Sequence, residues 1–444
     1  MKSKISDLQV ADELYGELKE KIKFDSITGK WLIWADKRWA LTEETAVISM
    51  CADLILQKLN NNSKQENMPN NCIYQRLTSQ QKIKNSLELI KPKLTTNLKQ
   101  LNTNDNLFNC ANGTVNLNEG ILLPHNKDDL ITKISGVEFQ KDAECILWLE
   151  FLKKITNNNK EYIDFLQEVV GSCLSGLSND QCLFILHGYG MNGKTVFVET
   201  IRALLGEYAC NAHRSFILKE TESSMDNRTE VFITSRLAIL SETEEKSTLN
   251  EKFLKLLAGS DTCTFKIGKE HFEYVNKAKI FIITNAKPIV TENDDAIWRR
   301  IHLLPFEAEI PYEERNIKLI EKLKENELPG ILNWAIKGFK VWREKDEGLQ
   351  PPSFIKEEVK KYEQENNSIS AFIEERCSTE DKNKNIQTRI LYCFYKEFCE
   401  EHDLRLLSQI KFVETLKRMG YAKTRIGNER AIQGIILTKK SHNV

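Results

Sequence analysis

Residues 181–206 read QCLFILHGYGMNGKTVFVETIRALLG, and this stretch decides the fold. Cys182 to His187 is a short apolar run of the kind that forms a buried parallel strand. Residues 188–195, GYGMNGKT, fit the phosphate-binding pattern G-x-x-x-x-G-K-[ST]. Apolar residues then recur at helical spacing until Gly206, which predicts a helix that ends at this glycine. Strand, glycine-rich turn and helix together predict a nucleotide-binding site in an α/β fold.

The residue types of this turn suit a bound nucleoside triphosphate. Glycines let backbone N–H groups close around phosphates, and the helix N-terminus adds partial positive charge. Lys194 is expected to reach the β/γ oxygens, and Thr195 is expected to bind Mg²⁺. The predicted nucleotide-binding residues are Gly188, Gly190, Asn192, Gly193, Lys194, Thr195 and Val196.

The composition excludes several classes of protein. With 41% hydrophobic and 29% charged residues, the chain of 444 residues has the profile of a soluble globular protein. It contains no apolar run of ~18 residues and no signal-peptide core, so we expect a cytoplasmic protein without a membrane partner. The eleven cysteines show no zinc spacing. A formal net charge of −1 means that any binding of DNA must depend on local basic patches.

Polar residues follow two further predicted strands. Arg236–Ser241 is a short apolar run, and we assign Glu242, directly after it, to Mg²⁺ binding and water activation, because ligands sit at the carboxyl ends of parallel strands. Glu244 is the alternative, and a solvated acidic turn is the simpler interpretation. Asn285 ends the strand Ala278–Thr284, where its amide can hold the attacking water, although the segment could equally form only a turn.

Arg299 and Arg300 directly precede a third apolar run, Ile301–Phe306. Arginine keeps its charge and pairs with phosphate oxygens through two N–H groups. A neighbouring subunit could therefore use one of the two as an arginine finger. The alternative is a pair of surface charges beside a core Trp298.

A β-hairpin is predicted between these segments. Thr262–Ile267 and Phe272–Val275 alternate between apolar and polar residues, with the four residues between them at the tip. Lys266, Lys269 and His271 on this hairpin could grip a DNA backbone. Three polar cations on a hairpin are otherwise a common solvated edge.

The flanking regions have different patterns. The N-terminal region reads as mixed strands and helices, with a tryptophan-rich hairpin predicted over Phe24–Leu41. A helical pattern from Ala143 to Leu177 leads into the nucleotide strand. After Pro351 and Pro352, three helical patterns and the hairpin Tyr421–Lys439 predict a winged helix-turn-helix.

The predicted winged helix is basic. Residues 405–444 contain nine Lys or Arg and two Glu. Such a balance on a helix and a wing is what duplex binding requires. The expected DNA-binding residues are Lys411, Lys417 and Arg418 on the helix, and Lys423, Arg425 and Arg430 on the wing. A basic surface that only balances the acidic linker is the alternative.

The ordered motifs GYGMNGKT, RLAILSETEE, LAGSDTCTFKIGKEHFEY, IFIITN and DAIWRRIHLLPF resemble those of superfamily 3 helicases of the AAA+ class. The resemblance is to the phage and plasmid primase-helicase family shared with poxviruses and satellite phages, and it covers roughly residues 20–310. It implies a hexameric ring with ATP bound between subunits. It also implies that Arg300, or Arg299, reaches in from the neighbour, and that the hairpins track single-stranded DNA. Arg300 is favoured because it directly precedes the apolar strand, as the family's finger does.

Two departures from the family matter. Many members carry arginine where Lys266 stands. Long relatives begin with a primase domain, whereas the first 150 residues here have neither zinc cysteines nor a D-x-D pair. The chain therefore looks like a stand-alone helicase, most like the self-loading replication initiators of staphylococcal mobile elements, in the cytoplasm of a bacterial host. The partners implied are single-stranded DNA, origin duplex, further copies of the chain, and a separate primase or host replication proteins.

We therefore predict an α/β fold in three parts. Residues 143–348 form an AAA+ P-loop core with a parallel sheet flanked by helices. A mixed α+β module (1–142) precedes it, and a winged-helix domain (349–444) follows. The predicted activity is ATP-dependent DNA unwinding that starts replication of a mobile element. Two alternatives remain: an ATP-switched initiator that binds an origin without unwinding, and a metabolic P-loop NTPase or kinase.

Overall fold

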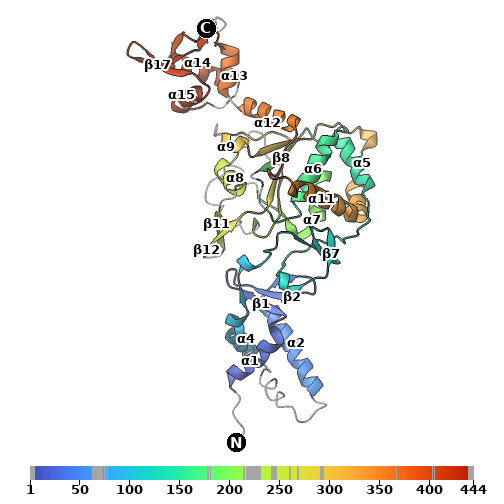
Figure 1. Ribbon diagram of the computed structural model, residues 1–444. Helices are drawn as coiled ribbons and strands as arrows, with labels where there is room; N and C mark the ends of the chain where they lie inside the picture. Colours follow the sequence, from blue (N-terminus) through green and yellow to red (C-terminus); the bar gives the residue numbers. More distant parts are fainter. Residues whose placement is uncertain are drawn as a thin grey trace.

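The structure is a computed structural model with a mixed α/β fold (Figure 1). It describes residues 6–62, 74, 77, 79–177, 180, 182–213, 216, 232–241, 248–259, 262–267, 270–290, 295–366, 368–402, 404 and 406–438. The N-terminal and C-terminal parts of the described chain lie at opposite ends of an elongated molecule, with the central sheet between them (Figure 1). No helix among the described residues is long and apolar enough to cross a membrane.

The centre of the fold is a parallel sheet of five strands. These are β8 (Leu183–His187), β9 (Ala209–Asn211), β10 (Leu237–Ser241), β13 (Lys279–Thr284) and β14 (Ile301–Pro305), in the spatial order β14-β8-β13-β10-β9. Strand β8 pairs in parallel with β14 on one side and with β13 on the other. The predicted apolar runs are therefore confirmed as strands of one parallel sheet, with ends within one residue of the prediction.

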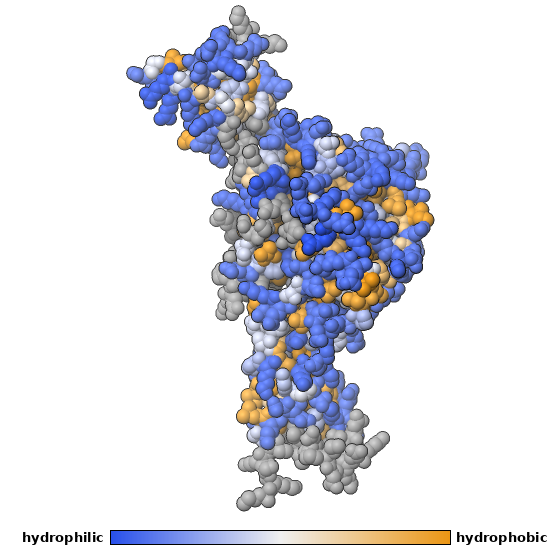
Figure 2. Space-filling view, viewed as in Figure 1, coloured by the Kyte–Doolittle hydropathy of each residue, from blue (hydrophilic) through white to orange (hydrophobic). Residues whose placement is uncertain are grey.

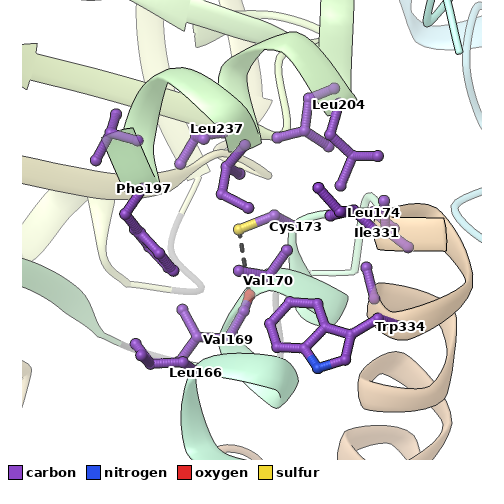
Figure 3. Close-up of a cluster of buried hydrophobic side chains, with 14 of the residues drawn as sticks. Leu166, Val169, Val170, Cys173, Leu174, Phe197, Leu204, Leu237, Ile331 and Trp334 are labelled. Atoms are coloured by element: carbon purple, nitrogen blue, oxygen red, sulfur yellow. Dashed lines mark hydrogen bonds between the residues drawn. The ribbon is translucent and has the colours of Figure 1, made fainter. Parts of the chain in front are cut away.

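Helices cover both faces of this sheet, and successive residues of β8 alternate between the two faces. Phe184 and Leu186 pack with α5 (Ile146–Ile155), α6 (Lys160–Ser172), α7 (Lys194–Leu205) and α11 (Leu328–Arg343). Leu183 and Ile185 pack on the other face with α8 (Glu251–Leu257) and α9 (Asp295–Trp298). Figure 3 shows the centre of the first cluster, where Leu166 and Val170 of α6 meet Phe197 of α7 and Trp334 of α11.

The helical pattern predicted from Ala143 to Leu177 is present as two helices, α5 and α6. Asn157 and Asn158 adopt positive φ angles of 50° and 59°, and the Asn159 side chain caps α6 by accepting from the Tyr162 N–H. Asparagine tolerates the left-handed region and is a preferred N-cap residue. The three consecutive asparagines therefore turn the chain between α5 and α6.

Two glycines let α6 and α11 approach each other closely. A Cβ atom at Gly338 would lie 2.0 Å from the Gln167 carbonyl oxygen, and one at Gly171 would lie 2.2 Å from the Phe339 nitrogen. The Gln167 side chain donates to the Trp334 carbonyl at 2.9 Å. The two helix backbones are thus in direct contact, which is possible only without side chains at these positions.

The N-terminal part has its own core. Its sheet has the order β3-β2-β1-β4, formed by β1 (Ile22–Asp25), β2 (Trp31–Trp34), β3 (Trp39–Thr42) and β4 (Thr95–Thr96). Helices α1 (Asp7–Leu18), α2 (Glu44–Asn62) and α4 (Gln80–Leu94) pack on this sheet. The hairpin predicted over residues 24–41 is present as β1 and β2 around Gly29, but the prediction missed a second reversal at Asp36, where φ is 57°, after which β3 completes a three-stranded meander.

A second small sheet joins this part to the centre. It consists of β5 (Leu107–Cys110), β6 (Gly113–Asn116) and β7 (Ile121–Leu123). Phe108 and Val115 are fully buried in the same cluster as α6 and α7. Although they precede residue 142, these strands pack on the central part of the molecule.

The C-terminal part begins after α12 (Ser353–Asn366), whose Tyr362 still packs on the central sheet. Its helices are α13 (Ser368–Arg376), α14 (Thr388–Glu401) and α15 (Gln409–Arg418). They pack on a three-stranded antiparallel sheet of order β16-β18-β17, formed by β16 (Asn385–Gln387), β17 (Ala422–Ile426) and β18 (Glu429–Gln433). The three predicted helical patterns are present as α13, α14 and α15, and the final hairpin is present as β17 and β18, although β18 ends at Gln433, six residues before the predicted end at Lys439.

Candidate functional site

A cavity of about 1090 Å³ lies where the parallel strands end. Ser241, Thr284 and Asn285 enter it from the carboxyl ends of β10 and β13, and residues 190–196 enter it from the turn after β8. Its other walls come from α5 and from the segment 310–319. We call it the strand-edge cavity. The carboxyl edge of an open α/β sheet is the usual place for a ligand.

The turn between β8 and α7 is shaped by its glycines. Gly190 and Gly193 have φ angles of 52° and 89°, in the left-handed region that favours glycine. A Cβ atom at Gly188 would lie 2.1 Å from both the Asn192 amide nitrogen and the Phe306 carbonyl oxygen. Helix α7 begins at Lys194, directly after this turn, so its N-terminal N–H groups open toward the cavity.

Lys194 is held in the middle of the turn. Its ammonium group donates to the Gly188 carbonyl and to the Asn192 side-chain oxygen, the latter at 3.1 Å. The Asn192 amide in turn donates to the Phe306 carbonyl at the end of β14. Burial lowers the pKa of Lys194 from its ordinary value. An anion in the cavity would therefore meet a cation that is already desolvated and fixed in place.

The structure brings most of the predicted nucleotide-binding residues together. Gly190, Asn192, Gly193, Lys194, Thr195 and Val196 line the strand-edge cavity. Gly188 does not line the cavity, but its backbone packs closely against Asn192 and Phe306, and its carbonyl accepts from Lys194. Asn285 also lines it, and its side chain is exposed at the end of β13. Glu242 and Glu244 lie outside the described residues, so their assignment stays a prediction.

Arg299 and Arg300 lie at the opposite edge of the same sheet. They precede β14, and Ile301 pairs with Leu183 at the start of β8. Arg300 is 9% exposed and donates to the Ala296 carbonyl at 2.6 Å, whereas Arg299 is exposed beside a separate cavity. A five-residue strand is ~16 Å long, so neither arginine reaches the strand-edge cavity of its own chain.

The predicted hairpin is present as β11 (Thr262–Ile267) and β12 (Glu270–Val275). Strand β12 starts two residues earlier than predicted, so Lys266 and His271 are cross-strand partners and the tip is shorter. The side chains of Lys266 and His271, and the whole of Lys269, lie outside the described residues.

The C-terminal cations lie on two neighbouring elements. Lys411 and Lys417 are exposed on α15, and the Arg418 side chain lies outside the described residues. Lys423, Arg425 and Arg430 are exposed on the β17–β18 hairpin. Because Arg425 pairs with Arg430 and side chains alternate along a strand, these three cations share one face of the hairpin. The surface of this part is mostly hydrophilic in Figure 2.

Sequence reasoning missed the segment that follows β14. Arg315 lines the strand-edge cavity and donates from Nη1 to the Met191 sulfur at 2.9 Å. Lys154 of α5 also lines it and pairs with Glu314 at 2.9 Å. The signal was available, because residues just after a parallel strand lie at the same edge as residues 188–195.

Fold and site together define an α/β protein with a glycine-rich turn and a large cavity at the carboxyl edge of its parallel sheet. Three family models match successive parts of the chain. The model described as D5 N terminal like matches residues 11–157, a family of unknown function (DUF5906) matches residues 186–300, and the Poxvirus D5 protein-like model matches residues 364–430.

Curated relatives are viral proteins. A putative helicase (L207/L206) of Acanthamoeba polyphaga mimivirus is 27% identical over 245 residues, covering 54% of this chain and 25% of that protein. The Primase D5 of Fowlpox virus is 26% identical over 208 residues, covering 43% of this chain and 23% of that protein. The matched part of the chain thus spans about a quarter of each relative.

A solved structure shares the fold along nearly the whole chain. The apo structure of the NrS-1 C-terminal region covers 97% of this chain and 100% of that one, with a TM-score of 0.55 and 11% identity. At this identity the likeness concerns the fold alone. The predicted resemblance to a family shared with poxviruses is confirmed at the level of D5-like models and viral relatives. The narrower likeness to staphylococcal elements stays a prediction.

Proposed function

We propose that the protein is an ATP-dependent DNA helicase that starts replication, with an AAA+ core and a C-terminal winged helix. One observation carries the proposal: the strand-edge cavity and Arg299–Arg300 lie at opposite edges of one sheet. In a ring of identical subunits, the arginine edge of one copy can meet the cavity edge of the next. The helicase names of the viral relatives support the same function.

The residues of the cavity fit ATP with Mg²⁺. The glycine turn offers backbone N–H groups, and Lys194 is a buried cation with a lowered pKa. Thr195 would hold the metal together with Glu242, and the bound Mg²⁺ would neutralise charge on the phosphates. In this proposal Lys194 moves from the Gly188 carbonyl to the phosphate oxygens, and Asn285 orients the attacking water.

The remaining steps follow from the assembly. Arg300 of a neighbouring copy stabilises the charge that develops on the phosphates, with Arg299 as the alternative finger. The β11–β12 hairpin grips single-stranded DNA in the central channel of a hexamer. The basic face of α15 and the β17–β18 hairpin binds origin duplex. We propose that the protein works in a bacterial cytoplasm on a mobile element, with a primase or host replication proteins as further partners.

The test is a complementation of two inactive variants. Lys194→Ala should abolish ATP binding, and Arg300→Ala should bind ATP but hydrolyse it about 10³-fold more slowly. A mixture of the two should regain DNA-stimulated hydrolysis, because some interfaces then combine an intact Lys194 with an intact Arg300. Arg343→Ala, at an exposed arginine near the end of α11, is the matched control and should behave as the wild type.

Two results would contradict the proposal. Mixed oligomers that form but regain no hydrolysis would show that the arginine does not act across an interface. Hydrolysis that ignores DNA, from a chain that stays monomeric, would favour a metabolic P-loop enzyme. Strand displacement on forked DNA separates the helicase from an initiator that binds DNA without unwinding it.

A further inference from the structure

We propose that Arg315 contacts the phosphates of the nucleotide bound by its own chain. The proposal rests on the nucleotide site argued above and adds to it a residue that acts within the same subunit. It differs in this respect from Arg300, which would act on the neighbouring subunit.

The segment that carries Arg315 is fixed to the glycine turn at its start. It leaves β14 at Phe306, whose carbonyl accepts a hydrogen bond from the Asn192 amide. It then returns along the cavity, where Ile310, Glu314 and Arg315 all line the wall. The connection to the turn is therefore built into the fold and does not depend on a partner chain.

On the side that faces the cavity, the guanidinium group of Arg315 has only a weak hydrogen-bond acceptor. Its Nη1 donates to the sulfur of Met191 at 2.9 Å, and its Nε donates to the Ile310 carbonyl at 2.9 Å. A thioether is a weak acceptor, and these two bonds use two of the five guanidinium N–H groups. The nearest acid along the chain, Glu314, is paired with Lys154 at 2.9 Å. Within the described residues Arg315 forms no ion pair with a carboxylate.

Met191 lies where a phosphate chain would run. It occupies the turn between Gly190 and Asn192, with a positive φ of 54°, and it lines the cavity. A phosphate is a far stronger acceptor than a thioether and can take two parallel N–H bonds from a guanidinium. Binding of a nucleotide would thus exchange a weak partner of Arg315 for a strong one. The bond from Nε to Ile310 keeps the side chain near the turn during the exchange.

The experiment measures nucleotide affinity at protein concentrations at which the chain is monomeric. Wild type, Lys194→Ala, Arg315→Ala and Arg315→Lys are titrated with Mg²⁺ and a non-hydrolysable ATP analogue, ADP or AMP. Lys318→Ala is the control, because Lys318 is an exposed cation three residues away that does not line the cavity.

Arg315→Ala should bind the ATP analogue about 10- to 100-fold more weakly, because hydrogen bonds between charged groups are lost. Its affinity for AMP should change much less, and Arg315→Lys should fall between Ala and wild type because it keeps charge without the planar fork. Lys318→Ala should bind like the wild type. Since Arg315 acts in its own chain, the loss should already be present in monomers.

Three outcomes would overturn the inference. If Lys194→Ala loses the ATP analogue while Arg315→Ala binds it like the wild type, Arg315 makes no phosphate contact and the proposed function stands. Equal weakening for AMP and the ATP analogue would show that only the shape of the cavity had changed. A wild-type monomer that binds no nucleotide would remove this inference, and a wild-type chain that binds none at concentrations at which it assembles would remove the proposed function as well.

Discussion

Replacing Gly338 by alanine should destabilise the centre of the molecule, although alanine is the better helix former. In α11 the new Cβ would lie 2.0 Å from the Gln167 carbonyl oxygen of α6, whereas real Cβ contacts lie beyond 3.0 Å. The two helices must therefore separate by about 1 Å at this point. The obstacle is backbone and cannot rotate away, so the cost lies toward the upper part of the ~1–3 kcal/mol known for overpacking.

The opposing effect is smaller. Alanine in a helix interior is favoured over glycine by about 0.5–1 kcal/mol. The net loss should be about 2 kcal/mol, which at an m-value of ~2 kcal/mol/M shifts the midpoint of urea unfolding by about 1 M. Trp148 and Trp334 lie in the same buried cluster, so tryptophan fluorescence can follow this transition. Glu168 of α6 pairs with Lys345 just beyond α11, and this bond would also be strained.

Gly16→Ala is the matched control. Gly16 is an exposed glycine inside α1, and a Cβ there would meet no atom within 4 Å. The same substitution should therefore stabilise the N-terminal part by about 0.5–1 kcal/mol. If Gly338→Ala also stabilised the protein, α6 and α11 could not be in backbone contact. Combining Gly171→Ala with Gly338→Ala should cost less than the sum of the two, because one separation relieves both clashes.

Three further outcomes are expected. Binding of ATP should weaken as pH rises through the lowered pKa of Lys194, because contact with phosphate raises that pKa. Between the pKa of the free site and the raised pKa of the complex, binding therefore takes up a proton. Calorimetry in buffers of different ionisation enthalpy measures this proton uptake. Burial lowers the pKa of His302 from 6.5 to about 4. Between pH 6.5 and 4, His302 is therefore protonated in the unfolded state but neutral in the folded state. The free energy of unfolding should drop by about 3 kcal/mol over that window; His302→Phe should remove this part in urea titrations at pH 7 and 4.5, and an unchanged pH dependence would contradict it. Lys423→Ala should weaken binding of all duplex sequences alike and reduce the salt slope by about 1, measured by filter binding between 50 and 200 mM salt.

The central sheet could be predicted from the sequence because its strands are buried on both faces. Residues 183–186 and 280–283 are apolar without interruption, and such short apolar runs bounded by polar residues are typical of strands buried on both faces. The glycine turn after β8 was equally predictable, since Gly188 admits no side chain next to Asn192 and Phe306. In both places the local sequence alone carries the reason for the structure: burial of apolar side chains in the strands, and the lack of space for a side chain at Gly188.

Other features depend on contacts that the local sequence does not contain. The reversal between β2 and β3 has no glycine, proline or asparagine, and Asp36 takes the positive φ there. Trp34 and Trp39 hold the two strands together with ring centroids 5.6 Å apart, which is a tertiary contact. The break at residues 157–159 was different, because a run of asparagines is a recognisable signal for a turn and a cap.

The two arginines around β14 show how strand direction assigns a role. Arg300 precedes the strand and Arg315 follows it, so they lie at opposite edges of the sheet although only fifteen residues separate them. In a parallel sheet only the carboxyl edge holds the chain's own ligand. Under the proposed function, a cation after the strand acts on the nucleotide of its own chain, whereas a cation before it acts on the nucleotide of another copy. The two roles can be told apart by experiment. Arg315→Ala should weaken nucleotide binding already in monomers, whereas Arg300→Ala should slow ATP hydrolysis only in oligomers.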